Sequence, residues 1–272
     1  FAILALAIVA CQDNSEETVP NQEIASIDMS DFSVFTNEDD LTSSKSSANN
    51  GLDRCHSMEV LNRQLKENPG LYKKMYNIEL HTRKLIAERG KPSDGGSGDE
   101  DIDVLPIEDG FGIINIPVYI HIIYPNANNI TDAQVNSQMS VLNSDFRNTN
   151  VNQLPSGTTF ANDATNAGFS FSLAGVFRHD DSKSSWGTNN SVKSAYPPIS
   201  PSTHLNIWVC EIGGGILGYA QFPGGNSSTD GVVLGGSYFG VTSGVYGGGR
   251  TATHEVGHYL NLRHIWGDGR CN

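Results

Sequence analysis

Apolar residues at helical spacing mark two consecutive helices before residue 90. Met58, Leu61 and Leu65 recur three or four positions apart, and the helix-ending run Asn68-Pro69-Gly70 follows them. A second run carries its apolar positions on one face: Leu71, Met75, Ile78 and Leu85. The pattern predicts a helical hairpin over 53–90, which is too small to enclose a core and should dock on another part of the chain.

From residue 105 onward the pattern predicts a globular domain. Residues 113–124 are a nearly continuous apolar run, which is typical of a buried strand. Thr131 and Gln134 form a capping box at the start of a helix, whose core stripe is Val135, Met139, Leu142 and Phe146. Alternating apolar positions predict further strands at 169–177 and 205–209. The glycine-rich segment 212–249 has short strand-like pieces at 217–222 and 232–234, which indicates either a loop or a flat edge strand that a peptide backbone can approach closely.

The stretches around these elements have the composition of connecting segments. Residues 12–52 are rich in Ser, Asn, Asp and Glu, which predicts a flexible tether. Residues 91–104 combine glycine, serine and acidic residues, which predicts a linker that is open to proteolysis. Residues 1–11, FAILALAIVAC, are too few to span a bilayer and indicate the core of an export signal without its positive start.

Cys11 is a candidate lipidation site. Residues 8–11 (Ile-Val-Ala-Cys) resemble the lipobox of bacterial lipoproteins, in which the signal is removed and the cysteine becomes the lipid-bearing N-terminus. This resemblance implies an outer-membrane or cell-surface lipoprotein, held at the membrane until processing releases it as a secreted protein. The alternative is an ordinary secretory signal with an incidental cysteine, and both interpretations predict export.

The net charge of the chain limits the classes of molecule that it can bind. There are 30 acidic against 17 basic side chains, a net charge of −13, and no basic cluster stands out. Such a surface repels a phosphate backbone, so the sequence predicts no nucleic-acid partner.

The motif that carries chemistry is HEVGHYLNLRH at 254–264. His254 and His258 are four residues apart, so on a helix both imidazoles face one ion. Glu255 lies on the adjacent flank, where a carboxylate can hold and deprotonate a water without binding the metal. The spacing predicts a zinc site with a general base.

His264 is the candidate third ligand, and it requires the helix to stop. A continuing helix would rotate His264 by about 600° from His258, to the far side of the axis. Asn261 stands between them, and asparagine is the non-glycine residue that best tolerates a left-handed turn at a helix end. We therefore expect the helix, capped by Thr251 or Thr253, to break at Asn261.

The stretch HEVGHYLNLRHIWGD resembles the zinc motif of the pappalysin/cytophagalysin branch of the metzincins, the ulilysin-like endopeptidases. LGYAQFPGG at 217–225 is similar to the cleft-rim strand of that family, and residues 129–150 to its first large helix. The resemblance covers about 53–272. It implies an α+β fold, in which a small helical prosegment precedes a metzincin upper catalytic subdomain with a twisted, mostly parallel sheet, a backing helix and an active-site helix. The family has glycine where this chain has Asn261.

The resemblance also implies an activity. His254, His258 and His264 would bind Zn²⁺, and Glu255 would polarise the water that attacks a peptide bond of a protein or peptide substrate. The family further carries a methionine-containing turn, a C-terminal subdomain and Ca²⁺ sites, whereas the last methionine of this chain precedes the zinc motif. We therefore expect the catalytic domain at 105–272 to be incomplete and any Ca²⁺ sites to lie outside this chain.

Cys55 is a candidate zymogen switch. In some related enzymes a prosegment cysteine occupies the open coordination position of zinc and keeps the enzyme latent, and Arg54-Cys55 precedes the helical hairpin as such a switch would. A thiolate is a strong zinc ligand that displaces water. The alternative role is that of a small apolar side chain, which is common for a free cysteine.

The resulting prediction is an exported, lipid-anchored precursor of a zinc endopeptidase. The competing hypothesis is a surface-anchored binding lipoprotein with a structural or vestigial zinc site. A structural site needs a fourth protein ligand, which Cys210 or Cys271 would have to supply. The remaining histidines have no motif partner: His56, His81, His121, His179 and His204.

Overall fold

The structure is a computed structural model that describes residues 27–34, 55–89, 112–150, 153, 155–159, 161 and 164–264. The export signal with Cys11, most of the predicted tether, the predicted linker and Cys271 lie outside these residues. Within the described part of the chain, no helix combines the length and the apolar character needed to cross a membrane.

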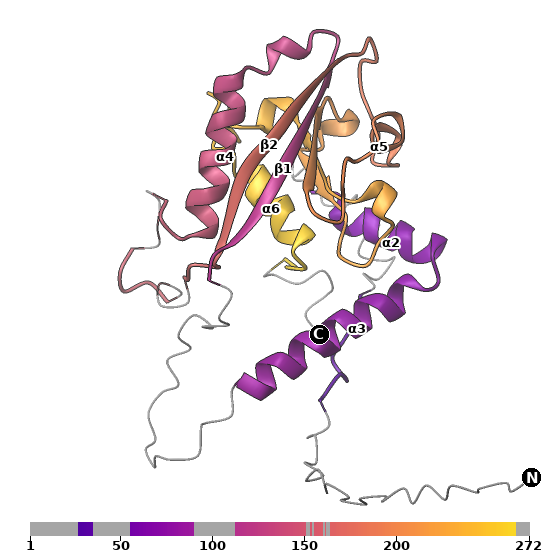
Figure 1. The fold of residues 1–272 in the computed structure, drawn as a ribbon, viewed down its shortest axis with the longest axis vertical. Coiled ribbons are helices and arrows are strands. Elements are labelled where there is room, and N and C mark those ends of the chain that lie inside the picture. The colour runs from indigo at the N-terminus through magenta and orange to yellow at the C-terminus, as the bar shows by residue number, and fades with distance from the viewer. Residues whose placement is uncertain are drawn as a thin grey trace, which may run out of the picture.

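A five-stranded sheet forms the centre of the fold (Figure 1). Its strands are β1 (Ile114–Tyr124), β2 (Phe169–Asp180), β3 (Leu205–Cys210), β4 (Gly218–Ala220) and β5 (Val232–Gly235). The strand order is β2-β1-β3-β5-β4, and only β4 runs antiparallel to its neighbour. The prediction of a mostly parallel sheet is confirmed, and the antiparallel strand β4 lies at one edge, with a side that no other strand of the sheet covers.

Two helices, α4 (Asp132–Phe146) and α6 (Arg250–Tyr259), pack on one face of this sheet. β1 contributes Val118, Ile120 and Ile122 to the core beneath them, all fully buried. The predicted stripe of α4 is confirmed, since each of its members is buried in the same core: Val135, Met139, Leu142 and Phe146. Apolar burial of this kind is the main force that holds α6 against the sheet.

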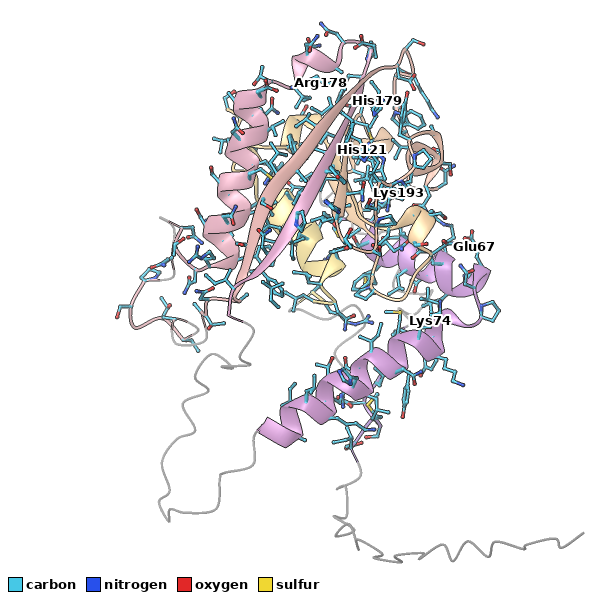
Figure 2. The ribbon with its side chains drawn as sticks, viewed as in Figure 1. Glu67, Lys74, His121, Arg178, His179 and Lys193 are labelled. Atoms are coloured by element: carbon cyan, nitrogen blue, oxygen red, sulfur yellow. The ribbon has the colours of Figure 1, made fainter. Side chains whose placement is uncertain are left out.

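The other face of the sheet packs against the segment that contains α5 (Ser191–Ala195). Its cluster comprises Trp208, Tyr219 and Val233 from the sheet, with Trp186 and Val192 from that segment. Lys193 of α5, labelled in Figure 2, is fully buried, and its ammonium group donates to the carbonyls of Thr229 and Gly231. Burial lowers the pKa of Lys193 to about 7. The short 3-10 helices are Ala127–Asn129, Gly213–Gly215, Ser227–Thr229 and Gly236–Tyr238.

The predicted helical hairpin is α2 (Ser57–Glu67) and α3 (Leu71–Arg89), and α2 docks beside β4. A separate apolar cluster joins Val34 to the two helices and to Phe222, which follows β4; its helix members are Met58, Leu61, Leu65, Leu71 and Met75. Leu85 was expected on the same face but is 38% exposed, because α3 extends past the body of the domain (Figure 1).

Residues 27–34, which belong to the predicted tether at 12–52, contact α3. Phe32 packs edge-on against Tyr72 and Tyr76, and Arg83 forms an ion pair with Asp31. Val34 is 1% exposed. The polar composition of 12–52 gave no sign of these contacts, because they depend on a surface of α3 that only the folded hairpin offers.

The helix starts differ in part from the expected caps. The hydroxyl of Thr131 accepts from the Gln134 amide N–H at 3.2 Å, as predicted. The Gln134 side chain, however, donates to the carbonyls of Gly236 and Phe239 instead of returning to Thr131. At α6 neither Thr251 nor Thr253 is the cap, because the helix begins after Gly249 at φ +71°. That position favours glycine, since a side chain there is strained.

Candidate metal centre

Three histidine side chains converge at the C-terminal end of α6. The Nε2 atom of His258 lies 3.1 Å from that of His254 and 3.2 Å from that of His264. The His254 and His264 atoms are also 3.2 Å apart. His254 and His258 share one face of the helix, and His264 reaches the same point from the chain beyond it, as the motif predicts.

A left-handed turn at Asn261 brings His264 back. Asn261 has φ +76°. Its N–H donates to the His258 carbonyl at 3.0 Å, and the Leu262 N–H donates to the Gly257 carbonyl at 2.9 Å. These two bonds are the pattern of a Schellman motif, which ends a helix and satisfies its last carbonyls. The predicted break of the helix at Asn261 is therefore present.

One hydrogen bond fixes the tautomer of His258 in the form that can bind a metal through Nε2. The Nδ1 atom of His258 lies 2.8 Å from the Leu262 carbonyl oxygen. A carbonyl only accepts, so Nδ1 carries the proton and Nε2 presents a lone pair to the cluster. The pKa of His254 is lowered, chiefly by desolvation and then by the charge of His264. Three Nε2 atoms this close together form a group that could hold one metal ion.

Cys55 completes the cluster from outside the motif. Its Sγ atom lies 3.4 Å from the His258 Nε2 and 3.6 Å from the Glu255 Oε2. The sulfur and the three imidazole nitrogens all lie within 4.8 Å of one another, so the four residues could hold one ion. Burial, followed by the charge of Glu255, raises the pKa of the Cys55 thiol, so only a bound cation would make it a thiolate.

The donor set fits zinc. A tetrahedral Zn²⁺ with nitrogens at roughly 2.0–2.1 Å places two nitrogens about 3.3 Å apart, and a sulfur at roughly 2.3 Å lies about 3.6 Å from a nitrogen. The nitrogen–nitrogen separations of 3.1–3.2 Å and the separation of 3.4 Å between the Cys55 sulfur and the His258 nitrogen are close to these values. Three imidazoles and one thiolate are also the ligand types that zinc prefers.

Glu255 lies beside the cluster and outside it. Its side chain is 1% exposed, and burial raises its pKa to about 7, while hydrogen bonds from Ser57 and Cys55 oppose that rise. The Ser57 hydroxyl donates to its Oε2 at 2.7 Å. This is the place on the flank of the helix that the motif predicts for a carboxylate that handles protons.

The open edge of β4 lies next to the cluster and is covered by the start of the hairpin. Cys55 and Gly218 form a parallel bridge, in which the His56 N–H donates to the Gly218 carbonyl at 3.3 Å. The Ala220 N–H donates to the Ser57 hydroxyl at 2.7 Å. The sequence gave no sign of this role of Ser57, because its partners lie 163 and 198 residues away.

Other candidate residues lie elsewhere. Cys210 is a free cysteine buried in the cluster on the opposite face of the sheet, so it does not supply a fourth ligand. His121 and His179 stack near each other on β1 and β2, with ring centroids 6.0 Å apart (Figure 2). His121 also stacks on Trp208, which makes it part of an aromatic layer.

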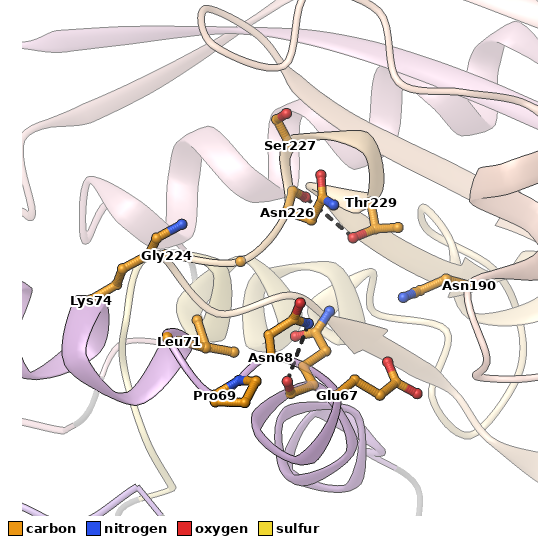
Figure 3. Close-up of a pocket in the computed structure, with 13 residues that line it drawn as sticks. Glu67, Asn68, Pro69, Leu71, Lys74, Asn190, Gly224, Asn226, Ser227 and Thr229 are labelled. Atoms are coloured by element: carbon orange, nitrogen blue, oxygen red, sulfur yellow. Dashed lines mark hydrogen bonds between the residues drawn. The ribbon is translucent and has the colours of Figure 1, made fainter.

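A polar cavity of about 840 Å³ separates the turn of the hairpin from the loop after β4 (Figure 3). Glu67, Asn68 and Lys74 line one side, while Asn226 and Thr229 line the other. It lies away from the histidines. The hairpin therefore contacts the rest of the domain mainly through α2 and leaves this region unpacked.

Comparisons with known proteins agree with this geometry. No family model matches the chain. A curated extracellular metalloprotease of Arthroderma otae is 37% identical over 114 residues, which is 39% of this chain and 41% of that protein. Mature mirolysin of Tannerella forsythia, solved with a cleaved peptide, is 42% identical with a TM-score of 0.54 and covers 58% of this chain and 66% of its own.

The precursor form gives the widest of these matches. A variant of Tannerella forsythia promirolysin is 34% identical with a TM-score of 0.61, over 79% of this chain and 71% of its own. The chain belongs to the ulilysin-like metzincin metalloproteases, the family of mirolysin. It has the mixed sheet and helices of that metzincin fold. It spans only 41–55% of the extracellular metalloproteases of Arthroderma otae and Arthroderma benhamiae.

The turn at Asn261 yields a test of the metzincin site. Asn261→Gly should leave the zinc affinity of the full-length protein unchanged, because glycine adopts φ +76° without strain. Asn261→Val should lower that affinity about tenfold, since a left-handed conformation costs a side chain roughly 1–2 kcal/mol and His264 would shift. Zinc titration against a competing chelator measures both.

The matched control for this test is Leu262→Ala, which keeps the backbone carbonyl that His258 contacts and removes a side chain that is 61% exposed. It should bind zinc normally. Unchanged affinity in the Asn261→Val protein would contradict the role of the turn.

Proposed function

We propose that this chain is the precursor of an exported, zinc-dependent endopeptidase. The observation that carries the proposal is the convergence of three imidazole nitrogens within 3.2 Å, with a buried carboxylate directly beside them. His254, His258 and His264 would hold Zn²⁺. Bound there, zinc would act as a Lewis acid that lowers the pKa of a water ligand and polarises a carbonyl group.

Glu255 is the residue that moves the proton. Its carboxylate would accept a proton from the attacking water and then donate it to the amine that leaves the cleaved bond. Its position beside His254 on α6 keeps it on the flank of the histidines. The backbone of α6 fixes this separation between base and ligands.

The proposed substrates are proteins or peptides. The side of β4 that pairs with no other strand of the sheet offers the backbone groups of an edge strand, to which an extended peptide can add once the hairpin has left. The hairpin already uses two of these groups, the Gly218 carbonyl and the Ala220 N–H. The mature mirolysin solved with a cleaved peptide supports a peptide ligand.

Residues 53–90 are proposed as an inhibitory prosegment, 91–104 as its linker and 105–272 as part of the catalytic domain. The described hairpin covers the edge of β4 and places Cys55 against the histidines. Promirolysin matches 79% of this chain and mature mirolysin 58%, a difference that supports a precursor. Cys55 would hold the position on the metal that water needs.

The attachment of the hairpin suits later release. Among the described residues, Phe222 is the one member of the apolar cluster around α2 and α3 that follows the linker, while Val60 of α2 packs with the sheet in the cluster that contains Tyr219. The polar cavity beside the turn of the hairpin reduces the contact. Export is supported by the extracellular metalloproteases to which the chain is similar. A lipid anchor on Cys11 is proposed from the lipobox resemblance alone.

The role of Glu255 can be tested in the full-length protein. Glu255→Gln should keep zinc and its fold, yet reduce proteolysis by about three orders of magnitude or more, because the amide cannot take the proton. Zinc content and peptide cleavage after removal of the prosegment measure the two effects. Cleavage at nearly the wild-type rate would exclude Glu255 as the base.

The coupling of activation to release is a second test. One cut within 91–104 should both raise activity and free the catalytic domain from the membrane, since Cys11 and Cys55 lie on the same side of the linker. Membrane fractionation followed by an activity assay measures this. Cys55→Ala should raise the activity of the uncut protein while it stays anchored. The coupling is wrong if processed, active enzyme remains membrane-bound, or if the Cys55 variant is no more active than its uncut parent.

A further inference from the structure

Ser57 joins two separate parts of the proposed catalytic cleft. It is the first residue of α2 and is fully buried. Its hydroxyl donates to the Oε2 atom of Glu255 at 2.7 Å and accepts from the Ala220 N–H, also at 2.7 Å. One hydroxyl group therefore occupies both the proposed base and a donor on the free edge of β4.

These two groups are the ones that catalysis would need. A carboxylate oxygen that already accepts a strong hydrogen bond is less available to a water molecule. An edge-strand N–H that already has an acceptor cannot bind the backbone of an incoming peptide. The Ser57 hydroxyl would thus hinder the binding of both reactants, the water at Glu255 and the substrate backbone at Ala220.

We propose that Ser57 is a second inhibitory contact of the precursor, independent of Cys55. The proposal rests on the proposed function and assigns a further part of its regulation. The contact of Cys55 with the histidines gains its strength from a bound metal ion. The contacts of Ser57 involve only protein atoms, so they persist when the metal or the Cys55 sulfur is removed.

The surroundings of Ser57 hold this contact in place. Leu61 and Leu65 of the same helix are buried in the cluster around Phe222. The Gln64 side chain donates to the Gln221 Oε1 at 2.8 Å, which ties α2, about two turns after Ser57, to the loop after β4. Because Ser57 and Glu255 are both buried, water does not compete for the hydrogen bond between them.

The consequence is latency in two steps. Removal of the Cys55 sulfur opens the metal to water but leaves the Glu255 carboxylate and the Ala220 N–H occupied. The uncut Cys55→Ala protein should therefore be more active than its parent and still well below the processed enzyme. Only departure of the prosegment releases both contacts.

The first test compares full-length variants, assayed before any cut within 91–104 is detectable by mass spectrometry. In the Cys55→Ala background, Ser57→Ala should raise the rate of peptide cleavage by about tenfold or more, the factor expected when a hydrogen bond to a charged group is lost. Gln64→Ala is the matched control, because it removes a buried hydrogen bond of the same helix without touching Glu255 or Ala220. It should raise the rate much less.

The second test does not depend on a loaded enzyme. In zinc-free, uncut protein, hydrogen–deuterium exchange of the Ala220 amide should be slow in the parent and in Gln64→Ala, and clearly faster in Ser57→Ala. An equal effect of the Gln64 and Ser57 variants on both measurements would reduce Ser57 to an ordinary packing contact and overturn the proposal. So would a Ser57→Ala protein that leaves both the rate and the exchange unchanged.

The two proposals fail in different ways. If processed wild-type enzyme cleaves no peptide or protein, the proposed function is wrong. If it cleaves, but Ser57→Ala adds nothing to Cys55→Ala, the inference about Ser57 is wrong while the protease remains.

Discussion

The Nε2 lone pairs of three histidines must converge on one metal position. This requirement determines the conformation of the chain at the C-terminal end of α6. Two of the imidazoles follow from the spacing of four residues on a helix, but the third lies six residues further on. It reaches the cluster only because the chain reverses at Asn261 with φ +76°. The Leu262 carbonyl of that turn then fixes the tautomer of His258. The turn therefore sets both the position of one ligand and the lone pair of another.

The hairpin completes the centre from a distance in sequence. It adds a sulfur to the three nitrogens, a strand-like contact to the edge of β4 and a hydroxyl to the buried carboxylate. Each contact takes a place that the proposed reaction would need, at the metal, at the peptide backbone and at the base. The geometry of residues 55–57 is the basis on which we propose a latent precursor, and the helices that follow them supply the apolar burial that holds this short segment in place.

Local patterns in the sequence predict most helices and strands of the fold. They fail where a residue's conformation or role depends on a contact with a distant part of the chain. The stripe of α4, the strand at 113–124 and the break at Asn261 follow from periodicity and from the conformational range of one residue type. The start of α6 does not follow from such patterns. The Thr253 hydroxyl donates to the Asp145 carboxylate instead of capping the helix, and Gly249 is the N-cap residue. The packing of Val34 and the contacts of Ser57 also escape prediction, since their partners are brought close only by the docked hairpin.

The central claim is that Cys55 and three histidines surround one zinc ion in the precursor. X-ray absorption spectroscopy of the zinc-loaded, full-length protein tests it most directly. The account predicts one sulfur at about 2.3 Å and three nitrogens at roughly 2.0–2.1 Å before cleavage, with the sulfur lost once the prosegment is removed. A spectrum of the uncut protein with only nitrogen and oxygen ligands, or a sulfur that remains after removal of the prosegment, would contradict it.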